Sequence, residues 1–332
     1  MIYRRLRRLF GKLMLIVGGG ASALLLAEFA IRLTTADVPP VPPEQQLVWA
    51  HWQGRNSEAR EQASQYYNSF GVYDRHLGLM SRALLQEEEQ FPARPGYRVI
   101  LLGDSITGDS PYSEKLMNGL RWVYPKMKFN FLVAGVPGWD TWQEAEYLRT
   151  RVEQLKPQLV ILQFCINDFA VTPVFWRGPD GNFYAYNAGK WSQYINKDLM
   201  THSRLARKVV YRLLQRFPQE PTPEDDKVSE GFKAAVELSQ RYKFTLRIVL
   251  LPAFGEKRDF DKGQRETVRA IIAENKLEAL TIDLLDLPTQ YPTHEWQREP
   301  GDAIHPNHKG AIILAQKIIA ELPSLETQAG SR

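Results

Sequence analysis

The sequence predicts an α/β fold in which helices cover both faces of a parallel β-sheet. Short, nearly continuous apolar runs alternate with longer stretches of helical periodicity from residue 97 onwards. Such runs are typical of parallel strands, because these strands are buried on both faces. Polar and glycine-containing segments follow several of the runs. These segments would lie at the carboxyl edge of the sheet, where α/β proteins bind ligands.

The expected elements can be placed along the chain from these two patterns. Strands are expected at the apolar runs over residues 98–102, 128–134, 159–164, 245–252 and 279–283. Helices are expected at residues 113–124, 142–155, 229–242, 262–275 and 308–322. The alternation of strand and helix is that of βαβ units, in which consecutive strands run parallel. We assign residues 96–325 to this main domain.

Residues 171–228 interrupt the alternation. An aromatic-rich stretch with turn signals comes first, then a basic amphipathic helix in "HSRLARKVVYRLLQRF", then the loop "PQEPTPEDD". We interpret the segment as an insertion near the carboxyl edge of the sheet. A packing elaboration and a substrate-shaping lid are both open interpretations of it.

The first 36 residues predict a membrane anchor. Five basic residues and no acid lie in residues 1–12, and an apolar run over residues 13–31 follows, interrupted by Glu28. As a helix at about 1.5 Å per residue, the run matches the ~30 Å hydrocarbon core of a bilayer. The basic flank predicts that the N-terminus stays in the cytoplasm and the rest is translocated.

Two alternatives to the anchor are open. A signal peptide cleaved near residues 21–23 or 34–36 would release the body as a secreted protein. A buried amphipathic helix of a soluble protein would explain Glu28. Beyond the anchor, residues 37–95 are expected to form an extended Pro-rich linker, "DVPPVPPEQQ", followed by helix and loop packed on the main domain.

Composition excludes several classes of function. The chain has 332 residues, of which 44% are hydrophobic and 24% charged, as in ordinary globular proteins. The net charge is +4, and because residues 1–12 carry +5, the remaining chain sums to −1. No basic stripe is left to bind a nucleic-acid backbone. The one cysteine, Cys165, excludes an intrachain disulfide and a cysteine-based metal site.

The segments that follow the expected strands carry residues suited to acyl transfer. They read "GDS" at 103–105, "GVPGWDT" at 135–141 and "CINDF" at 165–169, and "GDAIHPNHKG" at 301–310 precedes the last helix. Acyl transfer needs a hydroxyl nucleophile, an imidazole base and a group that orients the base. Ser105, His305 and Asp302 are candidates for these roles, although each segment alone is also a common turn.

The reaction also needs N–H donors for the developing oxyanion. Ser105 supplies a backbone N–H at a helix start, and Asn167 supplies a side-chain amide. Gly138 supplies a backbone N–H with no side chain in the way, and Gly135 is a rival for that role. A metal site at Asp302, His305 and His308 lacks further convincing ligands, so we expect neither metal nor cofactor. Cys165 is expected to be a buried, inert thiol.

The four segments together resemble the four sequence blocks of the SGNH, or GDSL-type, hydrolase family. The matching motifs are "GDSIT", "PGWDT", "IND" and "DAIHPN", in the family's order, and the resemblance covers about residues 97–323. It implies a three-layer, flavodoxin-like α/β/α fold. It also implies Ser105 as nucleophile, His305 as base and Asp302 as its orienting group. The oxyanion hole would consist of the Ser105 N–H, the Gly138 N–H and the Asn167 side chain.

The resemblance has further implications and two departures. "NSFGVYDR" at 68–75 is similar to the N-terminal module of membrane-anchored bacterial members. Cys165 stands where the family often has glycine, and the second block lacks an asparagine the family usually carries near Val133. Neither departure removes a catalytic group.

These observations predict a serine esterase that acts outside the cytoplasm on O-acetyl or other short acyl esters. The substrate would be an ester-bearing molecule such as an acylated glycan or lipid. Two alternatives use the same fold: an O-acyltransferase acting on an envelope polysaccharide, and a non-catalytic envelope scaffold. A nucleic-acid partner is not expected.

Overall fold

The computed structural model describes residues 2–34, 65–74, 76–169, 174–177, 183–186, 197–217, 225–254, 258–290 and 295–326. Its centre is a five-stranded sheet in the order β4-β3-β5-β8-β9, in which all neighbours are parallel. The strands are β3 (Tyr97–Gly103), β4 (Phe129–Gly135), β5 (Leu159–Phe164), β8 (Thr245–Leu250) and β9 (Thr281–Asp283). Every expected apolar run forms a strand, so the predicted α/β class is confirmed.

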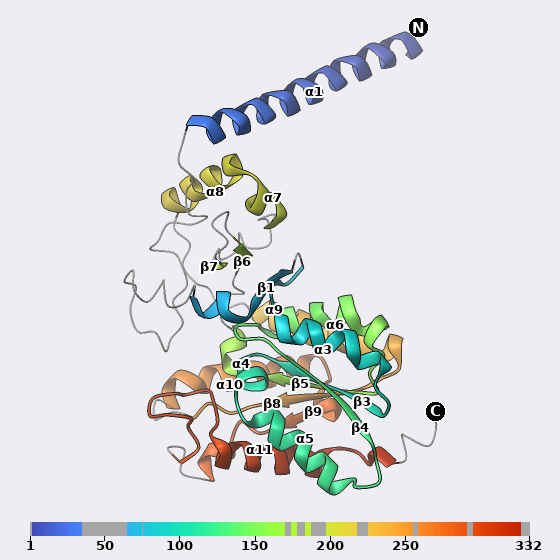
Figure 1. Ribbon diagram of the computed structural model, residues 1–332, viewed down its shortest axis with the longest axis vertical. Coiled ribbons are helices and arrows are strands. Elements are labelled where there is room, and N and C mark those ends of the chain that lie inside the picture. Colours follow the sequence, from blue (N-terminus) through green and yellow to red (C-terminus); the bar gives the residue numbers. More distant parts are fainter. Residues whose placement is uncertain are drawn as a thin grey trace.

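Helices cover both faces of the sheet (Figure 1). One layer comprises α3 (Arg82–Gln90), α6 (Thr141–Leu155), α9 (Asp225–Tyr242) and α10 (Arg258–Glu274), and the other comprises α5 (Tyr112–Val123) and α11 (His308–Glu321). Alternate residues of β3 enter the two cores, Ile100 and Leu102 on one face and Val99 and Leu101 on the other. Burial on both faces is therefore the reason why the strands read as continuous apolar runs.

Side-chain caps fix the starts of the helices that follow the polar segments. The Asp140 side chain accepts a hydrogen bond of 2.8 Å from the Gln143 N–H, and the Gln143 side chain accepts one of 3.3 Å from the Asp140 N–H. This capping box begins α6 directly after the "GVPG" turn. Asn307 caps α11 by accepting a 3.0 Å hydrogen bond from the Gly310 N–H. Both caps hold the loops before these helices in defined positions.

An N-terminal extension packs on the main domain through a β-hairpin. Residues 65–70 are helical, and β1 (Gly71–Asp74) pairs antiparallel with β2 (Gly78–Ser81). The sequence predicted helix and loop here and missed the hairpin, because four-residue strands carry too little periodicity to be recognised. The Leu79 carbonyl accepts a 2.9 Å hydrogen bond from Trp139 Nε1, so the hairpin supports the turn after β4.

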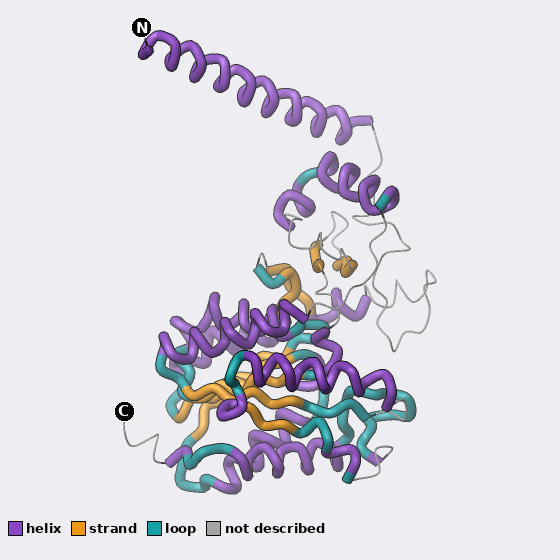
Figure 2. Tube along the Cα trace, turned by 180° about the vertical axis from the view of Figure 1, so that it is seen from behind, coloured by secondary structure: helices purple, strands orange, loops and turns teal. Residues whose placement is uncertain are grey.

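Helix α1 (Ile2–Thr34) extends away from the body in both views (Figure 1 and Figure 2). Its segment Val17–Thr34 has a mean hydropathy of 1.3 and none of it is buried, so it is long and apolar enough to cross a membrane. The linker expected at 37–46 lies outside the described residues. Within residues 171–228, the structure describes the antiparallel pair β6 (Val174–Arg177) and β7 (Phe183–Tyr186), then α7 (Lys197–His202) and α8 (Arg204–Arg216). Helix α8 is the expected basic amphipathic helix.

Candidate active site

The carboxyl ends of three neighbouring strands and the loop before α11 bring the candidate residues to one edge of the sheet. Ser105 begins α4 (Ser105–Asp109) directly after β3. Gly138 lies in the turn after β4, and Asn167 lies in η3 (Ile166–Phe169) after β5. Asp302 and His305 lie in the loop that leads into α11.

Ser105, His305 and Asp302 form a continuous hydrogen-bonded chain. His305 Nε2 lies 2.8 Å from Ser105 Oγ, although the two residues are 200 positions apart in the sequence. His305 Nδ1 lies 3.0 Å from each carboxylate oxygen of Asp302. The backbone N–H groups of His305 and Ile304 also donate to Asp302 Oδ1, at 2.9 and 3.1 Å. The short loop therefore positions the carboxylate under the imidazole.

The negative charge of Asp302 determines which ring nitrogen of His305 carries the proton. Burial opposes ionisation of Asp302, but the hydrogen bonds from His305 and the Ile304 N–H outweigh it and hold the pKa of the carboxyl far below its usual range. The Arg298 guanidinium, 3.1 Å from Asp302 Oδ2, adds an opposite charge. An ionised carboxylate only accepts hydrogen bonds, so Nδ1 carries the imidazole proton. Nε2 is then free to accept the Ser105 hydroxyl proton.

Asp104 supports both the turn before Ser105 and the side chain of Asn167. Asp104 Oδ1 accepts a 2.8 Å hydrogen bond from the Ile106 N–H, which caps α4. Asp104 Oδ2 accepts a 2.8 Å hydrogen bond from Asn167 Nδ2. An amide nitrogen has two hydrogens, so Asn167 Nδ2 has a second N–H besides the one that Asp104 accepts. The sequence alone did not single out Asp104, because no local pattern indicates a contact between residues 63 positions apart.

Gly138 occupies a turn that requires glycine. Its φ is +84°, and the Trp139 N–H donates a 3.0 Å hydrogen bond to the Val136 carbonyl. Pro137 and Gly138 are thus the central residues of a turn of type II, which needs a positive φ at its third position. The Val136 N–H donates to the Gly103 carbonyl at 3.2 Å, which joins this turn to the one before Ser105.

Gly135, the rival candidate for the oxyanion donor, lies in close contact with α4. A Cβ atom at Gly135 would overlap the backbone of Thr107 and Gly108. The absence of a side chain therefore lets α4 lie directly against β4. The same contact explains why residue 108 is glycine. Gly108 begins a second Gly-Asp-Ser tripeptide, which ends at Ser110. In that tripeptide Ser110 Oγ donates to the Ile106 carbonyl at 2.6 Å, so it serves the helix end.

Two further carboxyl groups are buried behind the loop that carries Asn167. Thr141 Oγ1 donates a 2.6 Å hydrogen bond to Asp168 Oδ2, which links the start of α6 to η3. Glu144 is fully buried, and neither of its carboxylate oxygens has a hydrogen-bond partner among the described residues. Burial, together with the negative charge of Asp168, raises the pKa of Glu144 well above its usual value. The pKa of Asp168 is likewise raised by burial and by Asp104.

Cys165 and His308 are the remaining candidate residues. Cys165 is buried, and burial raises the pKa of its thiol well above the usual value, as expected for an inert thiol. His308 is exposed at the start of α11. In the part of the chain that the structure describes, no group of three or more His, Cys, Asp or Glu side chains is placed to hold a metal ion.

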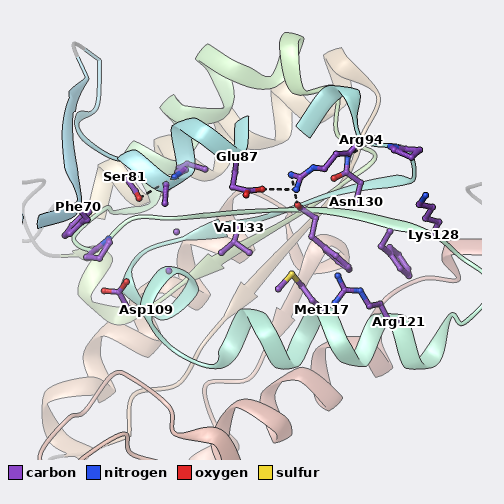
Figure 3. Close-up of a pocket in the computed structure, with 18 of the residues that line it drawn as sticks. Phe70, Ser81, Glu87, Arg94, Asp109, Met117, Arg121, Lys128, Asn130 and Val133 are labelled. Atoms are coloured by element: carbon purple, nitrogen blue, oxygen red, sulfur yellow. Dashed lines mark hydrogen bonds and ion pairs between the residues drawn. The ribbon is translucent and has the colours of Figure 1, made fainter. Parts of the chain in front are cut away.

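A groove runs along the free edge of β4, beside the site (Figure 3). Its volume is about 970 Å³, and Ser105 is not among its lining residues. Asp109 and Phe70 lie toward one end, while Arg121 and Lys128 lie toward the other. Gly108 and Pro137 also line it, so the groove reaches α4, which begins at Ser105, and the turn that contains Gly138.

The chain belongs to the GDSL-like lipase/acylhydrolase family, whose model matches residues 101–311. This assignment confirms the resemblance and identifies the protein as an ester hydrolase by family. No curated protein matches the chain.

Solved structures similar to the chain include three esterases or acylhydrolases. The acetyl xylan esterase AlAXEase is 15% identical, with a TM-score of 0.43, and the match covers 68% of this chain and 100% of that one. A catalytic mutant of the acetylxylan esterase Axe2 from Geobacillus stearothermophilus is 19% identical, with a TM-score of 0.43 and coverage of 68% and 94%. The lipase/acylhydrolase from Enterococcus faecalis is 19% identical, with a TM-score of 0.41 and the same coverage.

Proposed function

We propose that this protein is a membrane-anchored serine esterase that removes O-acetyl or other short acyl groups outside the cytoplasm. The observation that carries the proposal is the 2.8 Å hydrogen bond between His305 Nε2 and Ser105 Oγ, with Asp302 bound to the opposite imidazole nitrogen. This hydrogen-bonded chain supports Ser105 as the nucleophile, His305 as the base and Asp302 as the orienting group of acyl transfer.

The reaction proceeds in two steps. Ser105 Oγ attacks the ester carbonyl carbon while its proton passes to His305 Nε2, and the carbonyl oxygen becomes an oxyanion. The N–H groups of Ser105, Gly138 and Asn167 stabilise this charge. The C–O bond to the leaving alcohol breaks as His305 returns the proton to it. Water then attacks the acyl-enzyme by the same route, which releases the acid and restores Ser105.

The contacts of α1 support an anchor that stays attached. Glu28 and Arg32, near the outer end of the span, are hydrogen-bonded to residues at the junction of α7 and α8. Cleavage at residues 34–36 would remove both partners from the mature protein. An anchored chain with its basic N-terminus in the cytoplasm has its esterase domain outside.

The groove beside the site supports an extended substrate, such as an acylated glycan. It reaches α4 and the turn that contains Gly138. From there it extends along β4 past Val133 and Asn130 (Figure 3). The part of a long substrate that does not react would lie in this groove. The same space would also hold an acceptor hydroxyl, which is what an O-acyltransferase needs in place of water.

The full chain in detergent, assayed with p-nitrophenyl acetate, tests the proposal. Ser105→Ala should lower kcat by roughly 10⁴-fold or more, since the nucleophile is lost. Ser239→Ala is a matched control, because the Ser239 hydroxyl donates to the Val236 carbonyl within α9. Unchanged turnover in Ser105→Ala contradicts the mechanism. Turnover that forms an acetylated oligosaccharide, with little free acetate, would establish acyl transfer instead of hydrolysis.

A further inference from the structure

Glu28 caps the start of helix α8. One carboxylate oxygen accepts hydrogen bonds from Ser203 Oγ at 2.7 Å and from the Leu205 N–H at 2.9 Å. The other oxygen accepts the Arg204 N–H at 3.0 Å. The N–H groups of a first helical turn have no partner within their own helix, so a carboxylate at this position is strongly bound. The outer end of α1 is thereby joined to α8.

This contact explains why an acidic residue interrupts the apolar run of α1. A carboxylate facing hydrocarbon is unfavourable unless it is paired. Glu28 lies within the last turns of the span, and its partners are N–H groups, a hydroxyl and the Arg32 guanidinium at 2.7 Å. Arg204 also donates to the Arg32 carbonyl at 3.3 Å. The start of α8 is therefore held at the level where α1 leaves the hydrocarbon.

An apolar stripe runs along the exposed side of α8. Val209 and Leu213 are 48% and 52% exposed and lie four residues apart, and Phe217, the residue that caps the end of α8, is 56% exposed. Residues at this spacing lie on one side of a helix. Large apolar side chains on a single exposed stripe mark an interaction surface.

A basic stripe runs beside the apolar one. Lys208, Arg212 and Arg216 each precede a residue of the apolar stripe, so the two stripes are adjacent along the helix. Helix α8 contains no acidic residue. Arg207 is different, because it is buried and its guanidinium donates to the Met200 carbonyl at 2.6 Å. In the basic stripe, Arg212 and Arg216 are exposed and Lys208 is half-buried.

We propose that α8 lies on the outer surface of the membrane and binds anionic phospholipids. The apolar stripe enters the boundary between headgroups and acyl chains, and the basic stripe contacts the phosphate groups. Two features favour a lipid surface over a protein partner: the attachment to α1 through Glu28 and the purely basic charge of the helix. The inference rests on the proposal that α1 stays in the membrane. Its consequence is that the esterase domain is held close to the bilayer.

Depth-dependent quenching tests this placement in the full chain. The protein is reconstituted in nanodiscs of phosphatidylcholine, alone or mixed with phosphatidylglycerol, and Leu213→Cys is labelled with the fluorophore NBD. Wild type gives the background, because Cys165 is buried and its thiol pKa is raised. Lipids carrying a shallow nitroxide should quench the Leu213 label, by about twofold more in the anionic discs. A label that stays unquenched in both discs, or equal quenching in both, overturns the inference.

Two control labels separate this inference from the anchor on which it rests. A label at Leu25, which is exposed in α1, should be quenched in every disc. A label at Ile312, which is exposed on α11, should not be quenched. Quenching at Leu25 without quenching at Leu213 overturns only the placement of α8. An unquenched Leu25 label overturns the anchor as well.

Charge removal gives a second readout. In the labelled chain, the combined change of Lys208, Arg212 and Arg216 to Gln should abolish the difference between anionic and neutral discs. The matched change of Lys126, Lys233 and Lys317 to Gln, at three exposed positions outside α8, should preserve it. If the first variant keeps the full difference, the basic stripe does not bind the lipid phosphates.

Discussion

The carboxylate of Asp104 accepts a hydrogen bond of 2.8 Å from the side-chain amide of Asn167. This contact joins the turn after β3 to the turn after β5, and it orients the amide proposed to bind the oxyanion. Asp104 itself is fully buried, and its other carboxylate oxygen accepts a hydrogen bond from the Ile106 N–H. The proposed oxyanion hole would therefore depend on Asp104, which acts through Asn167 and not on the substrate itself.

Asp104→Asn should lower kcat by about 10²-fold with little change in KM, comparable to the loss of one oxyanion donor. The new amide can cap α4 with its oxygen, but its N–H₂ would then face the Asn167 donor. Asn167→Ala should give a similar loss. The double variant should be little worse than either single one, because both remove the same interaction. Fully additive losses would contradict the positioning role of Asp104.

Asp302→Asn should lower kcat at neutral pH by about 10⁴-fold. The amide can donate to Nδ1, which places the imidazole proton on Nε2, where the base must be free. The hydrogen-bonded chain should otherwise persist, so the variant should bind substrate with a similar KM. Turnover close to wild type would show that His305 does not need Asp302 as its orienting group.

Asp302 should also contribute to stability in a pH-dependent way. Its pKa is lowered by folding, so it stabilises the folded protein above the unfolded pKa near 3.9 and loses this effect as pH falls further. The free energy of unfolding of wild type should therefore exceed that of Asp302→Asn at pH 7. The difference should shrink on acidification below about pH 4. Urea titrations of both proteins at several pH values measure it, and a difference that grows on acidification would contradict the assigned charge.

Glu144→Gln should have the opposite pH dependence. Folding raises the pKa of Glu144, so the unfolded chain releases this proton more easily and stability falls as pH rises above about 4.5. The glutamine variant lacks that proton equilibrium. Its stability relative to wild type should increase between pH 5 and 8, as measured by denaturant unfolding. A constant difference across this range would mean that Glu144 does not titrate differently in the folded protein.

Substituting alanine for Gly138 and, separately, for Gly135 should distinguish a catalytic role from a packing role. Gly138→Ala forces an L side chain to a φ of +84°, which costs about 1–2 kcal/mol and displaces the proposed oxyanion donor. Gly135→Ala places a methyl group against the backbone of Gly108. We expect Gly138→Ala to lower kcat strongly with a small decrease in melting temperature. Gly135→Ala should lower the melting temperature with a small decrease in kcat. The reverse pattern would make Gly135 the oxyanion donor.

The sequence predicted most of the sheet because the strands are buried on both faces. Runs such as residues 98–102 have no polar alternation, and this pattern is unambiguous when helical stretches separate the runs. The site segments were equally readable, since each follows a strand end or precedes the last helix. Their meeting point could be inferred, because parallel strands place their carboxyl ends together.

Other features depend on contacts between distant parts of the chain. Glu28 and Ser203 are 175 residues apart, and nothing in either segment indicates the partner. Glu144 lies within a helix, where an acidic residue is normally exposed, so its burial gave no local signal. The β1–β2 hairpin is too short to show a strand period. These features come from packing, which periodicity does not encode.

Covalent trapping of Ser105 tests the central claim most directly. A fluorophosphonate probe reacts with a serine that is activated by an adjacent base, and peptide mass spectrometry then locates it. The account predicts one adduct per chain at Ser105, loss of esterase activity in parallel, and no adduct in the Ser105→Ala and His305→Ala variants. Labelling at Ser110 or another serine, or full activity in a chain modified at Ser105, would contradict it.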